Sequence, residues 1–247
     1  SALQDIKNAF FNPEGGSVLI ASHRGDHMVF PENSMAAFTD ATRFGTSVVE
    51  LDVRHSSDDS LMVIHDNTVN RTTNGEGIIS DHLYSKLKEL SLLDDFTGKE
   101  TQLKIPTLYE ALSLLKGKSM VDLDIKCDKI AAIYSMVERL DMFDQTIFFC
   151  DQSDMDYVLS KNPDALVMPR ARSMENLEQL MKKYHPNVVH IDDRNFNVPE
   201  AVKLIKEINP SCRIWANSLG ARDRAAITGD DSGILELHSL GINIIQT

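Results

Sequence analysis

The stretch SVVELDVRHSSDDSLMVIHD, residues 47–66, decides the fold. Its first part, 47–53, is an apolar run of the kind that is buried on both faces of a parallel sheet. A second apolar run, 61–65, follows after a short polar turn. Because a parallel partner strand needs a crossover of about a dozen residues or more, the second run is predicted to return antiparallel, as a hairpin.

On both sides of this hairpin, short apolar strands alternate with amphipathic helical patterns. Strands are predicted at 18–22, 47–53, 120–126, 146–150, 165–169, 188–192, 212–217 and 242–246. Helices are predicted at 3–11, 34–44, 107–116, 129–140, 153–161, 174–184, 199–208 and 231–240. The eight predicted strands, which leave out the hairpin strand, are the number found in a (β/α)8 TIM barrel, an α/β fold. The helix at 3–11 is expected to cover a barrel end.

The domain organisation follows from length and local composition. The 247 residues suit a single TIM-barrel domain spanning 1–247. The region 66–105 is rich in glycine and polar residues and too long for a plain loop, so a small insertion over the barrel's top is expected there. The chain stops at Thr247, directly after the eighth strand, and the final outer helix is therefore expected to be missing.

The charge balance narrows the possible partners. The net charge is −12, which disfavours nucleic acid and anionic membrane surfaces as partners. No apolar run approaches the roughly 18–20 residues needed to cross a bilayer, and no leader pattern is present. The cysteines Cys127, Cys150 and Cys212 lie far apart and are interpreted as buried or inert thiols. Because the net charge is negative, an anionic substrate would need local positive charge in its binding site, such as a bound divalent cation.

Polar side chains gather where the predicted strands end, which is the active-site face of a barrel. Glu50 and Asp52 are two residues apart on one strand, so both point to the same face. Asp124 lies on the next parallel strand and is expected to join them. Oxygen ligands of this kind favour a hard cation such as Mg²⁺ or Ca²⁺. The alternative is ion pairing of Glu50 and Asp52 with Arg24, Arg54 or Lys126.

Two histidines and two cations accompany these carboxylates. His23 and His65 end neighbouring strands, and each alone would be interpreted as structural, but as a pair they indicate acid–base chemistry. Arg24 and Lys126 suit phosphate oxygens. Hydrolysis of a phosphodiester needs charge neutralisation, a base for the nucleophile and an acid for the leaving group. These residues could supply each role.

Several short motifs, in order, resemble the glycerophosphodiester phosphodiesterase family of metal-dependent TIM-barrel hydrolases. The motifs are HRG…PENS, ELD, HDNTVNRTTNG, IPTLYEAL, DLDIK and IWAN. The resemblance implies a role for each matching residue, with His23 and His65 catalytic, Glu50, Asp52 and Asp124 binding the metal, and Arg24, Lys126 and Trp215 binding substrate. Asp124 departs from the family pattern, in which a Glu-x-Lys motif usually places glutamate there.

The expected function is metal-dependent hydrolysis of glycerophosphodiesters to glycerol 3-phosphate and an alcohol, with one Mg²⁺ or Ca²⁺ ion. The expected partner is thus a small-molecule phosphodiester, and the oligomeric state stays open. One alternative is a phosphodiesterase for another head group, such as an inositol phosphodiester or a lysophospholipid. Another is a non-catalytic phosphate-binding barrel. The initial Ser1 and the nature of the substrate favour a periplasmic or secreted protein over a cytoplasmic one.

Overall fold

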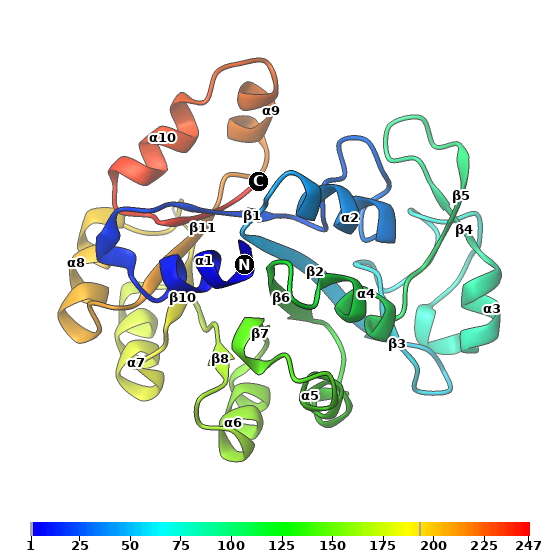
Figure 1. Ribbon diagram of the computed structural model, residues 1–247, viewed down its shortest axis with the longest axis horizontal. Helices are drawn as coiled ribbons and strands as arrows, with labels where there is room; N and C mark the ends of the chain where they lie inside the picture. The colour runs from blue at the N-terminus through cyan, green and yellow to red at the C-terminus, as the bar shows by residue number, and fades with distance from the viewer. Residues whose placement is uncertain (1, 193) are drawn as a thin grey trace. The chain divides into compact units, whose positions relative to one another are not determined.

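The computed structural model describes residues 2–192 and 194–247. The chain divides into two compact units. One comprises the segments up to Ala21 and from Leu166 to the end, and the other comprises Ser22–Ala165. In each unit, parallel strands are accompanied by helices that follow them in the chain (Figure 1).

The first unit contains a parallel sheet in the order β1–β12–β11–β10–β9. Its strands are β1 (Leu19–Ser22), β8 (Leu166–Val167), β9 (Arg170–Ala171), β10 (Val188–Ile191), β11 (Arg213–Asn217) and β12 (Ile244–Gln246). Its helices are α1 (Ala2–Phe10), the short 3-10 helix η1 (Pro13–Gly15), α7 (Met174–Tyr184), α8 (Val198–Ile208), α9 (Ala221–Ile227) and α10 (Ser232–Ser239).

Every second side chain of β10 and β11 points into the core of this unit. Val189 and Ile214 belong to a buried cluster that also contains apolar residues of α7, α8 and α10. Their neighbours along the strands therefore point to the opposite face. Among those neighbours, buried Arg213 at the start of β11 donates hydrogen bonds to the carbonyl groups of Phe10 (3.1 Å) and Ala9 at the end of α1. The N-terminal helix α1 therefore covers the amino end of β11.

The second unit contains the parallel strands β2 (Val48–His55), β6 (Met120–Ile125) and β7 (Thr146–Phe149) in that order. The antiparallel return of β3 (Leu61–Val63) along β2, with Val53 opposite Val63, confirms the predicted hairpin. The helices are α2 (Met35–Arg43), α4 (Leu108–Leu115), α5 (Ile130–Arg139), the 3-10 helix η3 (Phe143–Gln145) and α6 (Gln152–Lys161). Helix α4 begins with the capping box that Thr107 and Glu110 predict.

The region 66–105 forms the predicted insertion. It comprises the 3-10 helix η2 (Ile79–Asp81), α3 (Tyr84–Glu89) and the antiparallel pair β4 (Ser91–Leu93) and β5 (Glu100–Lys104). Buried apolar residues from this region pack on Met62 and Ile64, at and just after β3. The insertion therefore has its own small core, and the hairpin strand supplies one side of it.

Two elements differ from the sequence prediction. The strand predicted at 165–169 is only two residues long, as β8, and the chain resumes two residues later as β9, which pairs with β10. Pro169 separates the two pieces and has no backbone N–H to donate. Helix α9 was not predicted.

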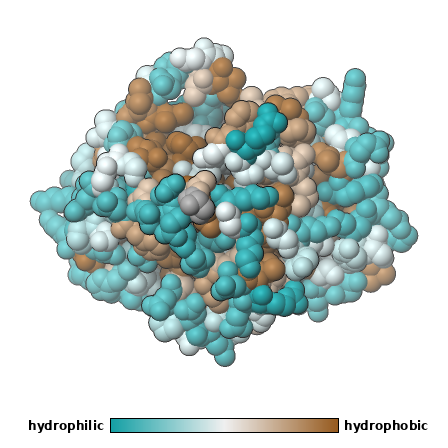
Figure 2. Space-filling model, viewed as in Figure 1, coloured by the Kyte–Doolittle hydropathy of each residue, from teal (hydrophilic) through white to brown (hydrophobic). Residues whose placement is uncertain are grey.

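Along the described chain, no helix is long and apolar enough to cross a membrane. Hydrophobic residues gather over α10, where Leu235 is exposed, while the surface over α8 is mostly hydrophilic (Figure 2).

Candidate active site

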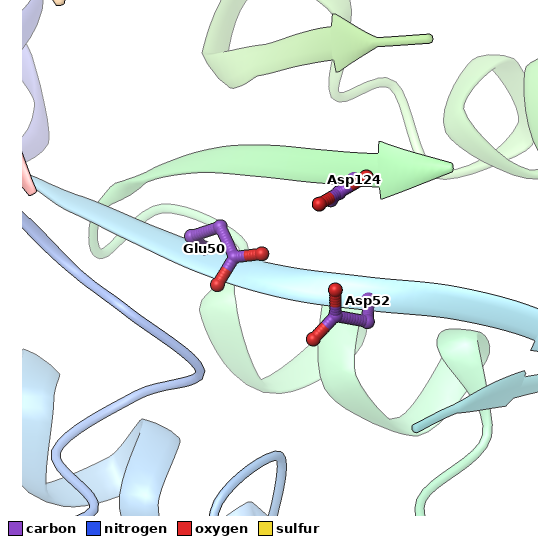
Figure 3. Close-up of side chains that lie close together, drawn as sticks. All are labelled: Glu50, Asp52 and Asp124. Atoms are coloured by element: carbon purple, nitrogen blue, oxygen red, sulfur yellow. The ribbon is translucent and has the colours of Figure 1, made fainter. Parts of the chain in front are cut away.

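Three carboxylates converge on the neighbouring strands β2 and β6 of the second unit. Glu50 and Asp52 lie on β2, and Asp124 is the register partner of Asp52 on β6. One oxygen from each of the three side chains lies within 4.8 Å of the others. Figure 3 shows the three carboxylates directed toward a common space. The structure thus brings together all three residues that the sequence assigns to a metal.

The electrostatics of this cluster require a compensating charge. Glu50 and Asp52 are only 3% and 1% exposed. Burial and the charges of Asp52 and Asp124 raise the pKa of Glu50 well above its usual range. Burial also raises the pKa of Asp124, although Lys126 opposes the shift. Asp52 Oδ1 is buried without a hydrogen bond. Three converging carboxylates, one with an oxygen that accepts no hydrogen bond, fit a hard divalent cation.

A fourth carboxyl group, Asp122, lies beside this cluster. It is the register partner of Glu50 on β6 and is 2% exposed. Burial and the charges of Asp124 and Asp52 raise the pKa of Asp122 well above its usual range. The sequence prediction missed this residue, although its spacing from Asp124 is the same as that of Glu50 from Asp52. Asp122 therefore adds to the repulsion that a cation would relieve.

Lys126 and Arg24 contact the carboxylates directly. Lys126 Nζ lies 2.9 Å from Asp124 Oδ2 and 3.4 Å from Asp52 Oδ1. Burial alone would lower the pKa of Lys126, but Asp124 and Asp52 raise it above its usual value. Arg24 Nε lies 3.4 Å from Asp52 Oδ2. Of the ion pairs that the sequence left as an alternative, those of Asp52 with Arg24 and Lys126 are present, and they bring two cations to the edge of the acidic cluster.

A turn with unusual backbone geometry positions Arg24. Arg24, Gly25 and Asn33 all have positive φ angles, of 56°, 80° and 54°. This conformation lets the Arg24 N–H donate to Glu50 Oε2 at 2.8 Å. Asn33 Nδ2 donates to Asp52 Oδ2 at 2.8 Å, and the Asp52 N–H donates back to Asn33 Oδ1 at 3.3 Å. The turn between β1 and α2 therefore holds the carboxylates of β2 as well as the arginine.

His23 precedes this turn in an environment that opposes its protonation. Burial, followed by the positive charge of Arg24, lowers the pKa of His23 to about 3. The ring packs edge-to-face on His27, with 6.0 Å between the ring centres. At neutral pH, His23 is therefore a neutral imidazole.

His65 has a carboxylate partner. Its Nδ1 lies 2.7 Å from Asp66 Oδ1. The hydrogen bonds from Arg71 and from His65 hold the pKa of Asp66 well below its usual range, so Asp66 is ionised and only accepts hydrogen bonds. His65 Nδ1 must therefore donate, which leaves Nε2 as the nitrogen available for proton transfer.

The glutamate of the PENS motif joins two arginines. Glu32 accepts a hydrogen bond from Arg24 Nη1 at 3.0 Å and two from Arg71, at 2.8 and 3.0 Å. The Glu32 N–H donates to Asp95 Oδ2 of the insertion at 2.9 Å. Neither Glu32 nor Arg71 was among the site residues predicted from the sequence. The available signal was their place in the PENS and NRTT motifs.

Comparison with known proteins identifies the family of this chain. The model of the glycerophosphoryl diester phosphodiesterase family matches residues 23–195. The chain belongs to this family. Among curated members, the glycerophosphodiester phosphodiesterase of Caldanaerobacter subterraneus is 44% identical over 109 residues, which is 44% of this chain and 45% of that protein. The enzyme of Bacillus altitudinis is 38% identical over 109 residues, or 43% of this chain and 44% of that protein. The match thus spans less than half the length of these curated phosphodiesterases.

Solved structures extend the likeness over nearly the whole chain. A glycerophosphodiester phosphodiesterase from Agrobacterium tumefaciens has a TM-score of 0.79 and 26% identity, covering 93% of this chain and 95% of that one. A phosphodiesterase from Oleispira antarctica, solved with the product sn-glycerol-3-phosphate, has a TM-score of 0.78 and 22% identity, covering 95% and 94%. This similarity confirms the expected α/β fold class, that of the TIM-barrel phosphodiesterases.

The phosphodiesterase resemblance also assigned Trp215 to the substrate. Trp215 lies on β11 of the first unit and is wholly buried. Its Nε1 donates a hydrogen bond to Asn217 Oδ1 at 3.2 Å. The other predicted site residues all belong to the second unit. The role of Trp215 in substrate binding stays a prediction.

Proposed function

We propose that this chain hydrolyses glycerophosphodiesters to glycerol 3-phosphate and an alcohol, with the help of a divalent cation. The observation that supports this most is the convergence of Glu50, Asp52 and Asp124 beside Arg24 and Lys126. Family membership and the names of the curated relatives point to the same reaction. The Oleispira structure, solved with glycerol 3-phosphate as product, agrees with it.

The acidic cluster is where a cation would bind. Glu50, Asp52 and Asp124 would hold it, and the oxygen-only donor set favours Mg²⁺ or Ca²⁺. When bound, the cation neutralises charge on the phosphoryl oxygens and so assists attack at phosphorus. Asp124 is one methylene shorter than the glutamate usual in the family. Lys126, at 2.9 Å from Asp124, holds this shorter side chain toward the cluster.

Arg24 and Lys126 bind the phosphodiester group. Arg24 offers a planar fork of N–H donors and Lys126 a point charge, and both suit phosphoryl oxygens. Both also contact Asp52, so the carboxylate keeps them near the reacting group. Because their positions depend on backbone and carboxylate contacts, they are oriented before substrate arrives.

The two histidines transfer the protons. Neutral His23 takes a proton from the attacking water as its oxygen forms the new bond to phosphorus. The bond from phosphorus to the alcohol oxygen breaks, and His65, protonated on Nε2, gives that proton to the leaving oxygen. The Asp66 carboxylate at Nδ1 holds the His65 ring in orientation for this transfer. Each histidine returns to its starting state by proton exchange with water.

The test is hydrolysis of glycerophosphocholine by protein freed of divalent cations. Glycerol 3-phosphate release should appear on addition of Mg²⁺ or Ca²⁺ and disappear with chelator. His23→Ala and His65→Ala should each lower kcat by roughly 10²–10⁴-fold, because each removes one proton transfer. His238→Ala, at an exposed histidine of α10, is the matched control and should retain activity. Undiminished activity in chelator or in His23→Ala would refute the proposal, as would the absence of turnover expected of a non-catalytic barrel.

A further inference from the structure

We propose that Arg71 is a positioning residue that sets both His65 and Arg24 through one continuous chain of charged hydrogen bonds. The chain runs from His65 to Asp66, Arg71, Glu32 and Arg24, in that order. It joins the end of the hairpin strand to the turn after β1, two segments that are distant in sequence. The inference rests on the proposed function, which gives His65 and Arg24 their roles.

Arg71 occupies the centre of this chain and uses both edges of its guanidinium group. Its Nε and Nη2 donate to the two oxygens of Asp66 at 2.8 and 2.9 Å. Its Nη2 and Nη1 donate to the two oxygens of Glu32 at 2.8 and 3.0 Å. Two-point contacts of this kind define orientation as well as distance. The plane of Arg71 therefore fixes the planes of both carboxylates.

Each carboxylate in turn orients a group that acts on substrate. Asp66 accepts the Nδ1–H of His65 and so selects the tautomer and the ring orientation. Glu32 accepts from Arg24 Nη1 and thereby limits the positions of the Arg24 guanidinium group. Burial alone would raise the pKa of Glu32, but the hydrogen bond from Arg71 and the charge of Arg24 lower it. Without Arg71, Glu32 would pair with Arg24 alone and could turn about that single contact, so the orientation of the Arg24 guanidinium group would be less well defined.

The position of Arg71 argues against a purely structural role. Its side chain is 49% exposed. The surrounding loop has other supports, since Gly77 N–H donates to Asn70 Oδ1 and Thr73 N–H donates to the Val69 carbonyl. The partly exposed ion pair of Arg71 with Asp66 is of a kind that contributes only about 0–1 kcal/mol to stability. Buried Glu32 keeps its ion pair with Arg24 when Arg71 is replaced. Replacing the Arg71 side chain should therefore disturb the orientation of its partners much more than the fold.

The experiment compares Arg71→Gln and Arg71→Lys with Arg43→Gln, which removes an arginine of 74% exposure from α2. Arg71→Gln should lower kcat roughly 10–100-fold with KM changed less than about 3-fold, because orientation is lost while Arg24 and Lys126 remain. Arg71→Lys should recover only part of kcat, because one ammonium group cannot bridge both carboxylates at two points. Arg43→Gln should match the wild type. The thermal midpoint should stay within a few degrees in all three.

A double-mutant cycle with Asp66→Asn separates positioning from a general structural effect. If Arg71 acts through Asp66, the double variant should lose little more kcat than the more damaged single variant. Multiplicative losses, or a kcat within 2-fold of wild type in Arg71→Gln, would overturn the inference. The NMR signal of the His65 Nδ1–H in cation-free protein gives a readout independent of turnover. It should shift or broaden in Arg71→Gln and stay in place in Arg43→Gln, even if the wild type hydrolyses no glycerophosphodiester and the proposed function fails.

Discussion

His23 links the electrostatics of a single residue to the stability of the fold. Unfolded His23 would take a proton near pH 6.5, whereas burial and Arg24 hold its pKa at about 3 in the folded protein. Between these values the unfolded state binds more protons. Acidification from pH 6.5 toward 3 must therefore lower the free energy of unfolding through this residue. Above pH 6.5 both states are neutral at His23, and its effect disappears.

Replacement of His23 by glutamine should remove this acid sensitivity. Relative to wild type, His23→Gln should gain roughly 1–2 kcal/mol between pH 6.5 and 4, after allowance for solvent screening of a half-buried ring. Urea unfolding of cation-free protein at a series of pH values measures the difference. His238→Gln is the control at an exposed position. A difference between His23→Gln and wild type that does not vary with pH would contradict the assigned environment of His23.

Among individual site residues, those at strand ends can be predicted from the sequence, whereas those that lie in loops are missed. Glu50, Asp52 and Asp124 follow from alternation and from the convergence of parallel strands. Asp122 carries the same signal, because alternation places it on the same face of β6 as Asp124. The partners Glu32 and Arg71 lie in turns, where no periodicity tells which way a side chain points. Their meeting depends on the path of the chain between β1 and α2 and through the insertion.

The turn between β1 and α2 shows how an element depends on one glycine. Gly25 has a φ of 80°, and a Cβ there would lie 2.9 Å from the backbone carbon of Ala37 and from the ring of buried Phe38. The same turn places the Arg24 N–H on Glu50. Gly25→Ala must therefore either strain the turn or move the start of α2 away from it. Both outcomes would displace Arg24 from the acidic cluster.

Gly25→Ala should cost roughly 2–4 kcal/mol of stability, as backbone strain and overpacking combine. The matched variant is Gly45→Ala, because Gly45 has a φ of 78° but open space around the added methyl group. It should cost only about 1 kcal/mol from backbone strain. Urea unfolding of the two variants gives the comparison. Equal losses would mean that Ala37 and Phe38 can move without penalty, contrary to their tight packing.

The prediction of helices was accurate where an apolar face repeats over several turns, and the elements that it missed are all short. Helices α2, α5, α7 and α8 lie within one or two residues of their predicted bounds, because each buries an apolar face of several turns. The predicted strand at 165–169 fails because Pro169 interrupts it and the pairing with β10 begins only at β9. The hairpin β4–β5 lies within a polar insertion, and its strands are too short to show alternation.

For the whole molecule, the distribution of charge sets a balance between stability and cation binding. The chain carries a net charge of −12, and three of its carboxyl groups, Glu50, Asp52 and Asp122, lie buried together on β2 and β6, with the partly exposed Asp124 beside them. Without a cation, burial and mutual repulsion raise the pKa values of Glu50, Asp122 and Asp124. At neutral pH, ionisation of these carboxyl groups is therefore less favourable in the folded protein than in the unfolded chain, which lowers the free energy of unfolding. A bound divalent cation would relieve this penalty in the folded state only, because the cluster exists only there.

Cation binding should therefore raise the thermal midpoint of the whole protein at neutral pH. At a free concentration about 100-fold above Kd, Mg²⁺ or Ca²⁺ should add about 2.7 kcal/mol, which corresponds to roughly 5–10 °C for a chain of this size. Thermal melts of cation-free protein at constant ionic strength measure the shift, and chelator should reverse it. Glu50→Gln should lose most of the shift, whereas Asp230→Asn, at an exposed carboxylate, should keep it. An equal shift in Glu50→Gln would mean that the ions act on the diffuse surface charge, since general screening does not distinguish a buried ligand from an exposed one.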